Sequence, residues 1–188
     1  MRVISGLFKG KKILIPKDKK TRPLKDLTKE SIFNIIKHSN KFKINFSEAF
    51  VLDLFCGVGS FGIECISRGV KKVVFIENYQ GVLPILKKNL RNLKSIKNYE
   101  IIEKDIYKNE VFLKLSFKFD IIFLDPPYKD KDLENLFDKI KKNEILKKDG
   151  IIILHRHKRE TNYIPLNFEL IEEKIYGISK IVFLSNLN

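Results

Sequence analysis

The stretch VLDLFCGVGSFG, residues 51–62, joins a short apolar run to a glycine-rich turn. VLDLF has the length and composition of a buried strand, and the residues from about 60 to 68 that follow it have a helical pattern. A strand, a glycine-rich turn and a helix in this order are typical of the first unit of an open α/β sheet. In such sheets ligands bind beyond the carboxyl ends of the strands, so this stretch predicts both the class of fold and the position of its site.

Strand-like and helix-like segments alternate through the rest of the chain. Further strands are expected at 73–77, 99–103, 119–125 and 151–154, with helices between them at 79–94, 106–115 and 132–141. Strands separated by helices form a parallel sheet with helices on both faces. The last segment, FELIEEKIYGISKIVFL (168–184), predicts an antiparallel hairpin that turns at Gly177. The expected fold is Rossmann-like α/β, with a mostly parallel seven-stranded sheet and a C-terminal antiparallel hairpin.

The N-terminal quarter of the chain is strongly basic. Residues 1–43 carry 13 Lys and Arg side chains against three carboxylates, which accounts for +10 of the net charge of +14. VISGLFKGKKILI (3–15) predicts a basic hairpin, and apolar residues spaced through 24–36 predict an amphipathic helix. Concentrated positive charge indicates an anionic partner, nucleic acid first and a membrane surface second. Lysine bias from an AT-rich genome is the alternative, but it explains the concentration poorly. We therefore expect a basic nucleic-acid-binding extension at 1–43 and a separate domain at 44–188.

Composition argues against several other classes of protein. Hydrophobic residues make up 44% of the chain, and no run approaches the roughly 18 apolar residues of a membrane span. The N-terminus lacks the apolar region of a secretory signal, which favours a cytoplasmic location. Cys56 and Cys65, with the scattered His38, His155 and His157, show no disulfide or metal-site pattern, and the histidines receive no role. Nothing in the sequence indicates more than a monomer.

Polar groups follow four consecutive predicted strands. The segment 53–62 follows the first, Glu77 ends the second, Asp105 lies just past the third, and the segment 125–128 follows the fourth. Because the carboxyl ends of parallel strands meet at one edge of a sheet, we expect these groups to form a single site.

The glycines of this site allow two interpretations. Gly57, Gly59 and Gly62 fit G-x-G-x-x-G, and Glu77 lies 20 residues after Gly57, as in a dinucleotide-binding site. Asp53 argues against a dinucleotide, because its carboxylate would repel a pyrophosphate. It would attract the ammonium and sulfonium groups of S-adenosylmethionine. We therefore favour S-adenosylmethionine and keep a nicotinamide-dependent dehydrogenase as the last-ranked alternative.

Two further carboxylates are positioned to bind the ribose and the adenine of S-adenosylmethionine. Glu77 can accept hydrogen bonds from both ribose hydroxyls. Asp105 can accept from the adenine amino group, although an Asp at this point can equally cap the N-terminus of a helix. Both interpretations of Asp105 stay open.

The segment FLDPPYKD (123–130) ends a strand with an acid, two prolines and an aromatic residue. Proline restricts the backbone, so the Asp125 carboxylate and the Pro126 carbonyl form a stiff pair of acceptors for an amino group. Tyr128 can stack on a flat base, an interaction worth about 1–3 kcal/mol. The exocyclic amine of a nucleobase is nearly planar. Two acceptors that hydrogen-bond to its N–H groups favour a more pyramidal nitrogen, whose lone pair can then point at the methyl donor. Asp125 is then the nearest acceptor for the released proton.

These motifs resemble one known family over nearly the whole chain. DPPY (125–128) is similar to the (D/N)PP(Y/F) signature of methyltransferases that modify exocyclic base amines. TRPLKDLTKESIFNII (21–36) and VLDLFCGVGSFGIECISRG (51–69) resemble two stretches of the RsmD family, and both chain ends are similar as well. RsmD enzymes are bacterial and methylate guanine N2 of 16S ribosomal RNA with S-adenosylmethionine. The resemblance implies the class I methyltransferase fold, that substrate within the 30S subunit or its assembly intermediate, and that cofactor. It also implies that the basic extension at 1–43 binds RNA and that 44–188 is the S-adenosylmethionine-dependent methyltransferase domain.

The resemblance also implies roles for individual residues. The expected cofactor-binding residues are Asp53, Phe55, Gly57, Gly59, Glu77 and Asp105. The expected catalytic residues are Asp125, Pro126 and Tyr128, and those on the RNA side are Arg22, Lys25, Asp26 and Glu30; no metal is expected. His155 departs from the family, which often has a glutamate there. A DNA adenine or cytosine methyltransferase with the same DPPY chemistry, and a non-catalytic RNA-binding protein on this fold, are the alternatives.

Overall fold

The computed structural model describes residues 1–17, 24–94, 96–127, 132–160 and 164–187. The helices are α1 (Asp26–His38), α2 (Ser60–Ser67), α3 (Leu83–Arg91), α4 (Asn109–Phe112) and α5 (Leu133–Lys142), with a 3₁₀ turn at Phe46–Glu48. The strands are β1 (Phe50–Leu54), β2 (Lys72–Ile76), β3 (Tyr99–Ile102), β4 (Phe119–Leu124), β5 (Leu146–His157), β6 (Phe168–Tyr176) and β7 (Ser179–Asn186). None of the helices in this described part is long and apolar enough to span a membrane.

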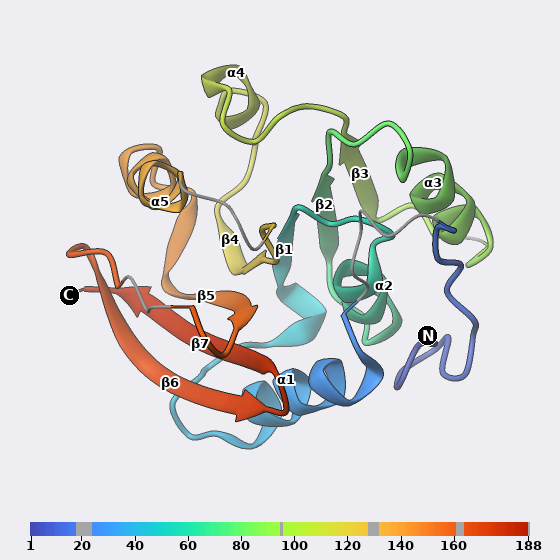
Figure 1. Cartoon of the computed structure of the whole chain (residues 1–188), viewed down its shortest axis with the longest axis horizontal. Coiled ribbons are helices and arrows are strands. Elements are labelled where there is room, and N and C mark those ends of the chain that lie inside the picture. Colours follow the sequence, from blue (N-terminus) through green and yellow to red (C-terminus); the bar gives the residue numbers. More distant parts are fainter. Residues whose placement is uncertain (18–23, 95, 128–131, 161–163, 188) are drawn as a thin grey trace.

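The seven strands form one sheet in the order β3-β2-β1-β4-β5-β7-β6 (Figure 1). Neighbours from β3 through β5 pair in parallel, and β7 pairs antiparallel with both β5 and β6. The β6–β7 connection turns at Gly177, whose φ of 62° lies in the left-handed region that glycine adopts without strain. The fold predicted from the sequence is therefore confirmed, including the C-terminal hairpin.

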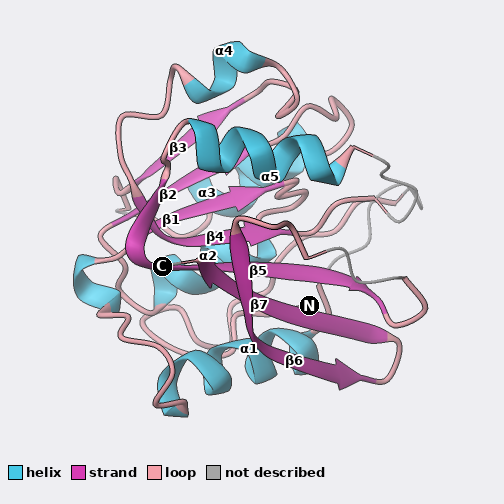
Figure 2. Ribbon diagram, turned by 90° about the vertical axis from the view of Figure 1, so that its left-hand side faces the viewer, coloured by secondary structure: helices cyan, strands magenta, loops and turns pink. Residues whose placement is uncertain are grey.

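Side chains of the buried strands alternate between two cores. In β4, Ile121 and Phe123 belong to one cluster, while Ile122 and Leu124 belong to the other. The first cluster includes α1, α2 and α3, and the second includes α4 and α5 (Figure 2). This is the period of two that a strand buried on both faces requires. The central strands of the sheet are thus covered on both sides, whereas the edge strand β6 has exposed residues along its length.

Three predicted elements differ in extent. The helix expected at 79–94 is shorter, because α3 covers only Leu83–Arg91. The helix expected at 106–115 is reduced to the single turn α4, because residues 105–108 form a turn of their own closed by the Lys108 N–H to the Asp105 carbonyl at 3.0 Å. The strand expected at 151–154 is longer, because β5 continues as far as His157 in its pairing with β7. That extra length carries β5 past the end of β4 and brings His155 beside the segment that follows β4.

The basic N-terminal segment is tied to the rest of the fold. Its hairpin is closed by an antiparallel bridge between Arg2 and Lys12, and it lies beside α2 and α3 (Figure 1). Glu64 of α2 accepts from the backbone N–H groups of Ile4 and Ser5 at 2.7 and 2.9 Å. Val3 and Ile13 of this segment are buried in the same core as α2. The segments before and after residue 43 therefore differ in charge and in proposed role. They nevertheless pack into one hydrophobic core.

Candidate active site

Residues from five strands form one row across the carboxyl edge of the sheet. The pairing sets Ile76 and Leu124 on either side of Leu54, with Ile102 beyond Ile76 and Leu154 beyond Leu124. After β1, β2 and β4 the next residue begins a loop, at Phe55, Glu77 and Asp125. β5 continues past this row, and His155 is the residue that follows Leu154 on it. The structure thus brings together the polar groups that the sequence predicted to be neighbours, and adds His155.

The loop between β1 and α2 is held in an unusual backbone conformation. Phe55 has a φ of 56°, which costs a non-glycine residue conformational energy and is often found at functional sites. Gly59 has a φ of 82° and stands at the N-cap of α2, where an added Cβ would come within 2.6 Å of Leu86 Cδ1. These constraints explain why the chain turns sharply from a buried strand into a buried helix at this point.

Asp53 supports this loop from within the sheet. It is only 1% exposed, and its Oδ2 accepts a hydrogen bond from the Gly62 N–H at 2.9 Å. That N–H is one of the first amides of α2, which have no partner inside the helix. Burial raises the pKa of Asp53 well above its usual value, the Gly62 hydrogen bond opposes the rise, and the nearby charges of Asp125 and Glu77 add to it. The negative charges of Asp53, Glu77 and Asp125 therefore interact at this edge of the sheet. Such a concentration of negative charge favours a cationic ligand.

Glu77 holds the start of the same loop. Its Oε2 accepts from the Gly57 N–H at 2.7 Å, and its Oε1 accepts from the N–H groups of Asn78 and Tyr79, both at 2.9 Å. Oε1 thus already accepts two hydrogen bonds, whereas Oε2 accepts one and retains capacity for a further donor, such as a hydroxyl group. A Cβ built on Gly57 meets no atom within 4 Å, so the backbone there is open to a neighbouring molecule.

Asn89 connects the glycine loop to the N-terminal segment. Its side-chain amide donates to the carbonyls of Val58 and Leu14 at 3.1 and 3.0 Å, and its Oδ1 accepts from the Leu14 N–H at 2.9 Å. The residue is 3% exposed. The loop at the candidate site and the basic segment thus share one buried side chain. Sequence reasoning missed Asn89, which has no recognisable signal within the helical pattern of α3.

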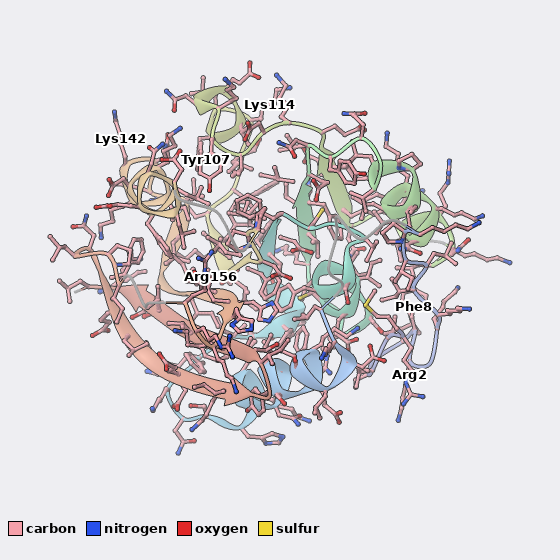
Figure 3. All side chains as sticks on the ribbon, viewed as in Figure 1. Arg2, Phe8, Tyr107, Lys114, Lys142 and Arg156 are labelled. Carbon is pink, nitrogen blue, oxygen red and sulfur yellow. The ribbon has the colours of Figure 1, made fainter. Side chains whose placement is uncertain are left out.

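Asp105 lies just past β3, as expected. Its Oδ1 accepts from the Tyr107 N–H at 3.0 Å, so it closes a local turn and does not cap α4. The rings of Phe55 and Tyr107 lie 6.0 Å apart between centroids, which places the turn after β3 beside the loop after β1. Tyr107 lies between α4 and α5 in Figure 3, and Lys139 of α5 donates to its carbonyl.

Asp125 is held by a partner that sequence reasoning left without a role. Its Oδ1 lies 2.8 Å from Nδ1 of His155, and the ring Nε2 lies 3.0 Å from Oγ of Ser179. Pro126 is buried beside it and Pro127 is exposed, while Tyr128 lies outside the described residues. The signal for His155 was available, because it directly follows the strand predicted at 151–154, and Asp125 likewise stands at the end of a predicted strand. Ser179 had no such signal, because its place depends on the β5–β7 register.

The residues expected on the RNA side are placed differently from one another. Lys25 and Glu30 are exposed on the first turns of α1. Asp26 is half-buried and accepts from the Arg2 N–H at 3.3 Å, so it holds the N-terminal segment against the helix. Arg22 lies outside the described residues. Lys29, between them in sequence, is fully buried and lies 3.6 Å from Glu64, a contact the sequence pattern did not predict.

The cysteines have the character of core residues. Cys56 and Cys65 are both free and buried, and burial raises the pKa of each thiol well above its usual value, with nearby carboxylates adding to the shift. Such thiols are poor nucleophiles. Within the described ranges, no three His, Cys, Asp or Glu side chains are grouped so that they could hold a metal ion.

The sheet order, the glycine loop and the acidic residues at the ends of β1, β2 and β4 define a class I methyltransferase fold. The chain belongs to the family described as Conserved hypothetical protein 95, whose model matches residues 1–185. The RsmD resemblance is confirmed by the curated relatives. Ribosomal RNA small subunit methyltransferase D of Haemophilus influenzae is 36% identical over 95% of this chain and 90% of its own length. Its Escherichia coli K12 counterpart is 27% identical over 94% and 85%.

Solved structures show the same fold. A methyltransferase candidate from Escherichia coli superposes with a TM-score of 0.81 at 26% identity, covering 99% of this chain and 97% of its own. A methylase candidate from Haemophilus influenzae gives a TM-score of 0.76 at 32% identity, covering 100% and 99%. Both likenesses span the basic N-terminal segment as well as the sheet.

Proposed function

We propose that this protein transfers a methyl group from S-adenosylmethionine to the exocyclic N2 of a guanine in 16S ribosomal RNA. The observation that carries the proposal is the position of the Asp125 carboxylate, one residue past β4, close enough to Asp53 to raise its pKa. A group that can hold a base amine is thereby adjacent to the acidic loop suited to a cationic methyl donor. The names of the curated relatives, ribosomal RNA small subunit methyltransferases, support RNA as the substrate.

The residues around the glycine loop fit S-adenosylmethionine. The open backbone at Gly57 admits close approach, and Oε2 of Glu77 has acceptor capacity for a ribose hydroxyl. Asp53 supplies negative charge beneath the loop. We assign the turn that contains Asp105 to the adenine ring of the cofactor. The cofactor supplies an activated methyl on a positively charged sulfur. Its leaving group needs no protonation, so the protein's task is alignment, which can contribute roughly 7–11 kcal/mol.

We assign Asp125 to the target amine. Its Oδ1 is engaged by His155, and no other described residue hydrogen-bonds to this carboxylate, so Oδ2 is available to accept from an amine N–H. The Pro126 carbonyl is assigned as the second acceptor, and Tyr128 as the ring that stacks on the base. After transfer, the nitrogen carries an extra proton, and Asp125 is the group placed to take it. The base must leave its stack to reach this edge of the sheet.

The basic segment 1–43 is assigned to the RNA backbone. Lys9, Lys12 and Lys17 are exposed on it, and Asn89 joins Leu14 of the same segment to Val58 of the glycine loop. Lys25 and Glu30, at the start of α1, are assigned to the RNA close to the target base. The protein acts as a monomer in this proposal, on the 30S subunit or a precursor of it.

The test is methyl transfer from labelled S-adenosylmethionine to 30S particles from a strain that lacks the corresponding gene. Digestion to nucleosides and mass spectrometry should identify N2-methylguanosine as the product. Naked 16S RNA and unmethylated DNA serve as parallel substrates. Methyladenine or methylcytosine in the DNA arm, with none in the RNA, would replace our proposal with the DNA amino-methyltransferase alternative. Failure to bind the cofactor would favour a non-catalytic RNA-binding protein.

A further inference from the structure

His155 is the centre of a three-residue chain at the end of the sheet. Its ring contacts Asp125 through Nδ1 at 2.8 Å and Ser179 through Nε2 at 3.0 Å. The side chain is 11% exposed, against 23% for Asp125, and Ser179 is 7% exposed as a residue. The most accessible member of the chain is therefore the carboxylate, and the other two lie behind it.

The positions of the three residues follow from the strand register. Leu124 pairs with Leu154, so Asp125 and His155 are the next residues on neighbouring parallel strands. His155 pairs with Ile181 of β7, and Ser179 lies two residues along that strand, where diagonal side chains on one face can meet. β5 has partners on both sides, β4 and β7, so the histidine projects from a rigid part of the sheet.

Hydrogen-bond chemistry fixes the direction of each contact. An ionised carboxylate only accepts, so Nδ1 must carry the hydrogen that is donated to Asp125. In the neutral ring, Nε2 is then an acceptor, and the Ser179 hydroxyl is the group that can donate to it. Ser179 thus holds the tautomer in which Nδ1 can donate to Asp125.

The same three residue types form the catalytic chain of many hydrolases, but the arrangement here serves a different purpose. In a hydrolase the serine must be open to the substrate, and the acid lies behind the histidine. In this protein the serine is buried within β7 and the acid is at the accessible end. Asp125 is therefore the residue of the three that is positioned to contact a substrate.

We propose that His155 is a positioning residue that fixes the orientation of the Asp125 carboxylate for the target amine; this proposal rests on the methyl-transfer function above. The bond to Oδ1 removes the rotational freedom of the carboxylate and leaves Oδ2 to face the amine. His155 itself touches no substrate atom. Misplacement of a catalytic group by about 1 Å can cost on the order of 100-fold in rate, so a single supporting bond can matter at this level.

Two matched substitutions separate the two ends of the ring. His155→Asn puts an amide nitrogen where Nδ1 stands, so it keeps the donor to Asp125 and loses the contact with Ser179. His155→Gln puts its amide nitrogen near the place of Nε2 and loses the donor to Asp125. We expect kcat to fall about 10- to 100-fold in His155→Gln and less than about 5-fold in His155→Asn. KM for 30S particles and Kd for S-adenosylmethionine should stay within about 2-fold in both variants.

A double variant tests whether His155 acts through Asp125. If it does, Asp125→Asn with His155→Gln should be no slower than Asp125→Asn alone, because the carboxylate that the histidine orients is already absent. Multiplying rate losses would overturn the proposal, and so would equal kcat values for His155→Gln and the wild-type protein. A parallel rise in KM and Kd for both His155 variants would show that the residue is merely structural.

A measurement without turnover keeps this inference separate from the proposed function. In ¹⁵N-labelled protein, the His155 ring should show a slowly exchanging Nδ1–H signal that shifts in Asp125→Asn, and a change at Nε2 in Ser179→Ala. These signals report the contacts whether or not RNA is the substrate. If the wild-type protein methylates no RNA but the signals behave as described, the proposed function fails and the His155–Asp125 contact stands. If the Nδ1 signal is indifferent to Asp125→Asn, the positioning proposal fails.

Discussion

The carboxylate of Asp53 accepts a hydrogen bond from the Gly62 N–H at 2.9 Å, so a buried acid in β1 supports the first turn of α2. Gly62 has no side chain at this contact, and a Cβ there would come within 2.3 Å of the Phe75 ring. The glycine is therefore required by close packing against β2. Asp53 supports the loop and carries charge beneath the proposed cofactor site, and these two roles can be separated by experiment.

Replacing Asp53 with Asn should stabilise the ligand-free protein and lower its affinity for S-adenosylmethionine. Folding raises the pKa of Asp53, so the native state binds this proton more tightly than the unfolded chain. The wild type therefore loses stability as pH rises from about 4 toward the raised native pKa. Asn keeps an acceptor for Gly62 without the charge. Its Tm should exceed that of the wild type near pH 7.5, with the difference vanishing near pH 4.

The same variant should distinguish a sulfonium from a neutral sulfur. We expect Asp53→Asn to weaken S-adenosylmethionine binding about 10-fold by calorimetry, and S-adenosylhomocysteine binding by less. Asp138→Asn, an exposed substitution on α5, should change neither affinity. Equal losses for both ligands would show that Asp53 acts through loop structure and not through charge.

Replacing Asp125 with Asn should abolish most of the transfer while leaving cofactor binding intact. Loss of an acceptor for the amine proton should reduce kcat about 100-fold or more. Kd for S-adenosylmethionine should stay within about 2-fold, because the carboxylate is assigned to the base. Single-turnover assays with 30S particles measure the first quantity and calorimetry the second. Normal turnover would remove Asp125 from the mechanism.

The sequence predicted the residues at the strand ends of this site better than it predicted the contacts between segments that are distant in the chain. Glu77 and Asp125 were recognisable because apolar runs stop at them, and Asp53 because it is an acid inside the apolar run VLDLF; parallel strands bring such ends together. His155 stands in the same relation to its strand but was given no role. The shared contacts of Asn89 and the burial of Lys29 depend on how distant segments pack, which local periodicity does not encode.

Replacing Asn89 with Ala should loosen the N-terminal segment and the glycine loop together. The side chain makes three hydrogen bonds in a buried place, two to Leu14 and one to Val58. Losing them and leaving the Leu14 amide unpaired should lower the free energy of unfolding by about 2–3 kcal/mol. Urea titration measures that loss, and hydrogen exchange at the Leu14 amide should become faster. Asn135→Ala on α5 is the control, expected within about 0.5 kcal/mol of wild type.

Breaking the buried Lys29–Glu64 pair should cost more than breaking an exposed one. Burial lowers the pKa of Lys29, and the charges of Glu64 and Asp26 oppose that shift, so removing Glu64 leaves the ammonium poorly compensated. Glu64→Gln should therefore destabilise the protein by about 3 kcal/mol. The exposed Lys71–Glu48 pair, at 2.9 Å, gives the control Glu48→Gln, expected to change stability by less than about 1 kcal/mol. Similar losses in the two variants would contradict this account.

Neutralising the exposed lysines of the N-terminal segment should reduce the salt dependence of RNA binding. If Lys9, Lys12 and Lys17 each neutralise a phosphate, replacing all three with Gln should lower the slope of log K against log salt by roughly 2. Binding of S-adenosylmethionine, measured without RNA, should not change.

The matched control for this variant carries the same charge change elsewhere. Lys114, two residues past α4, and Lys142, the last residue of α5, lie on the opposite side of the molecule from Arg2 and Phe8 (Figure 3). With Lys148, they form a second triple Lys→Gln variant, again of exposed side chains. Its slope should match that of the wild type when binding is titrated from about 50 to 200 mM salt. If both triple variants lose affinity equally, net charge and not the N-terminal segment governs RNA binding, and the assignment of residues 1–43 to the RNA backbone is wrong.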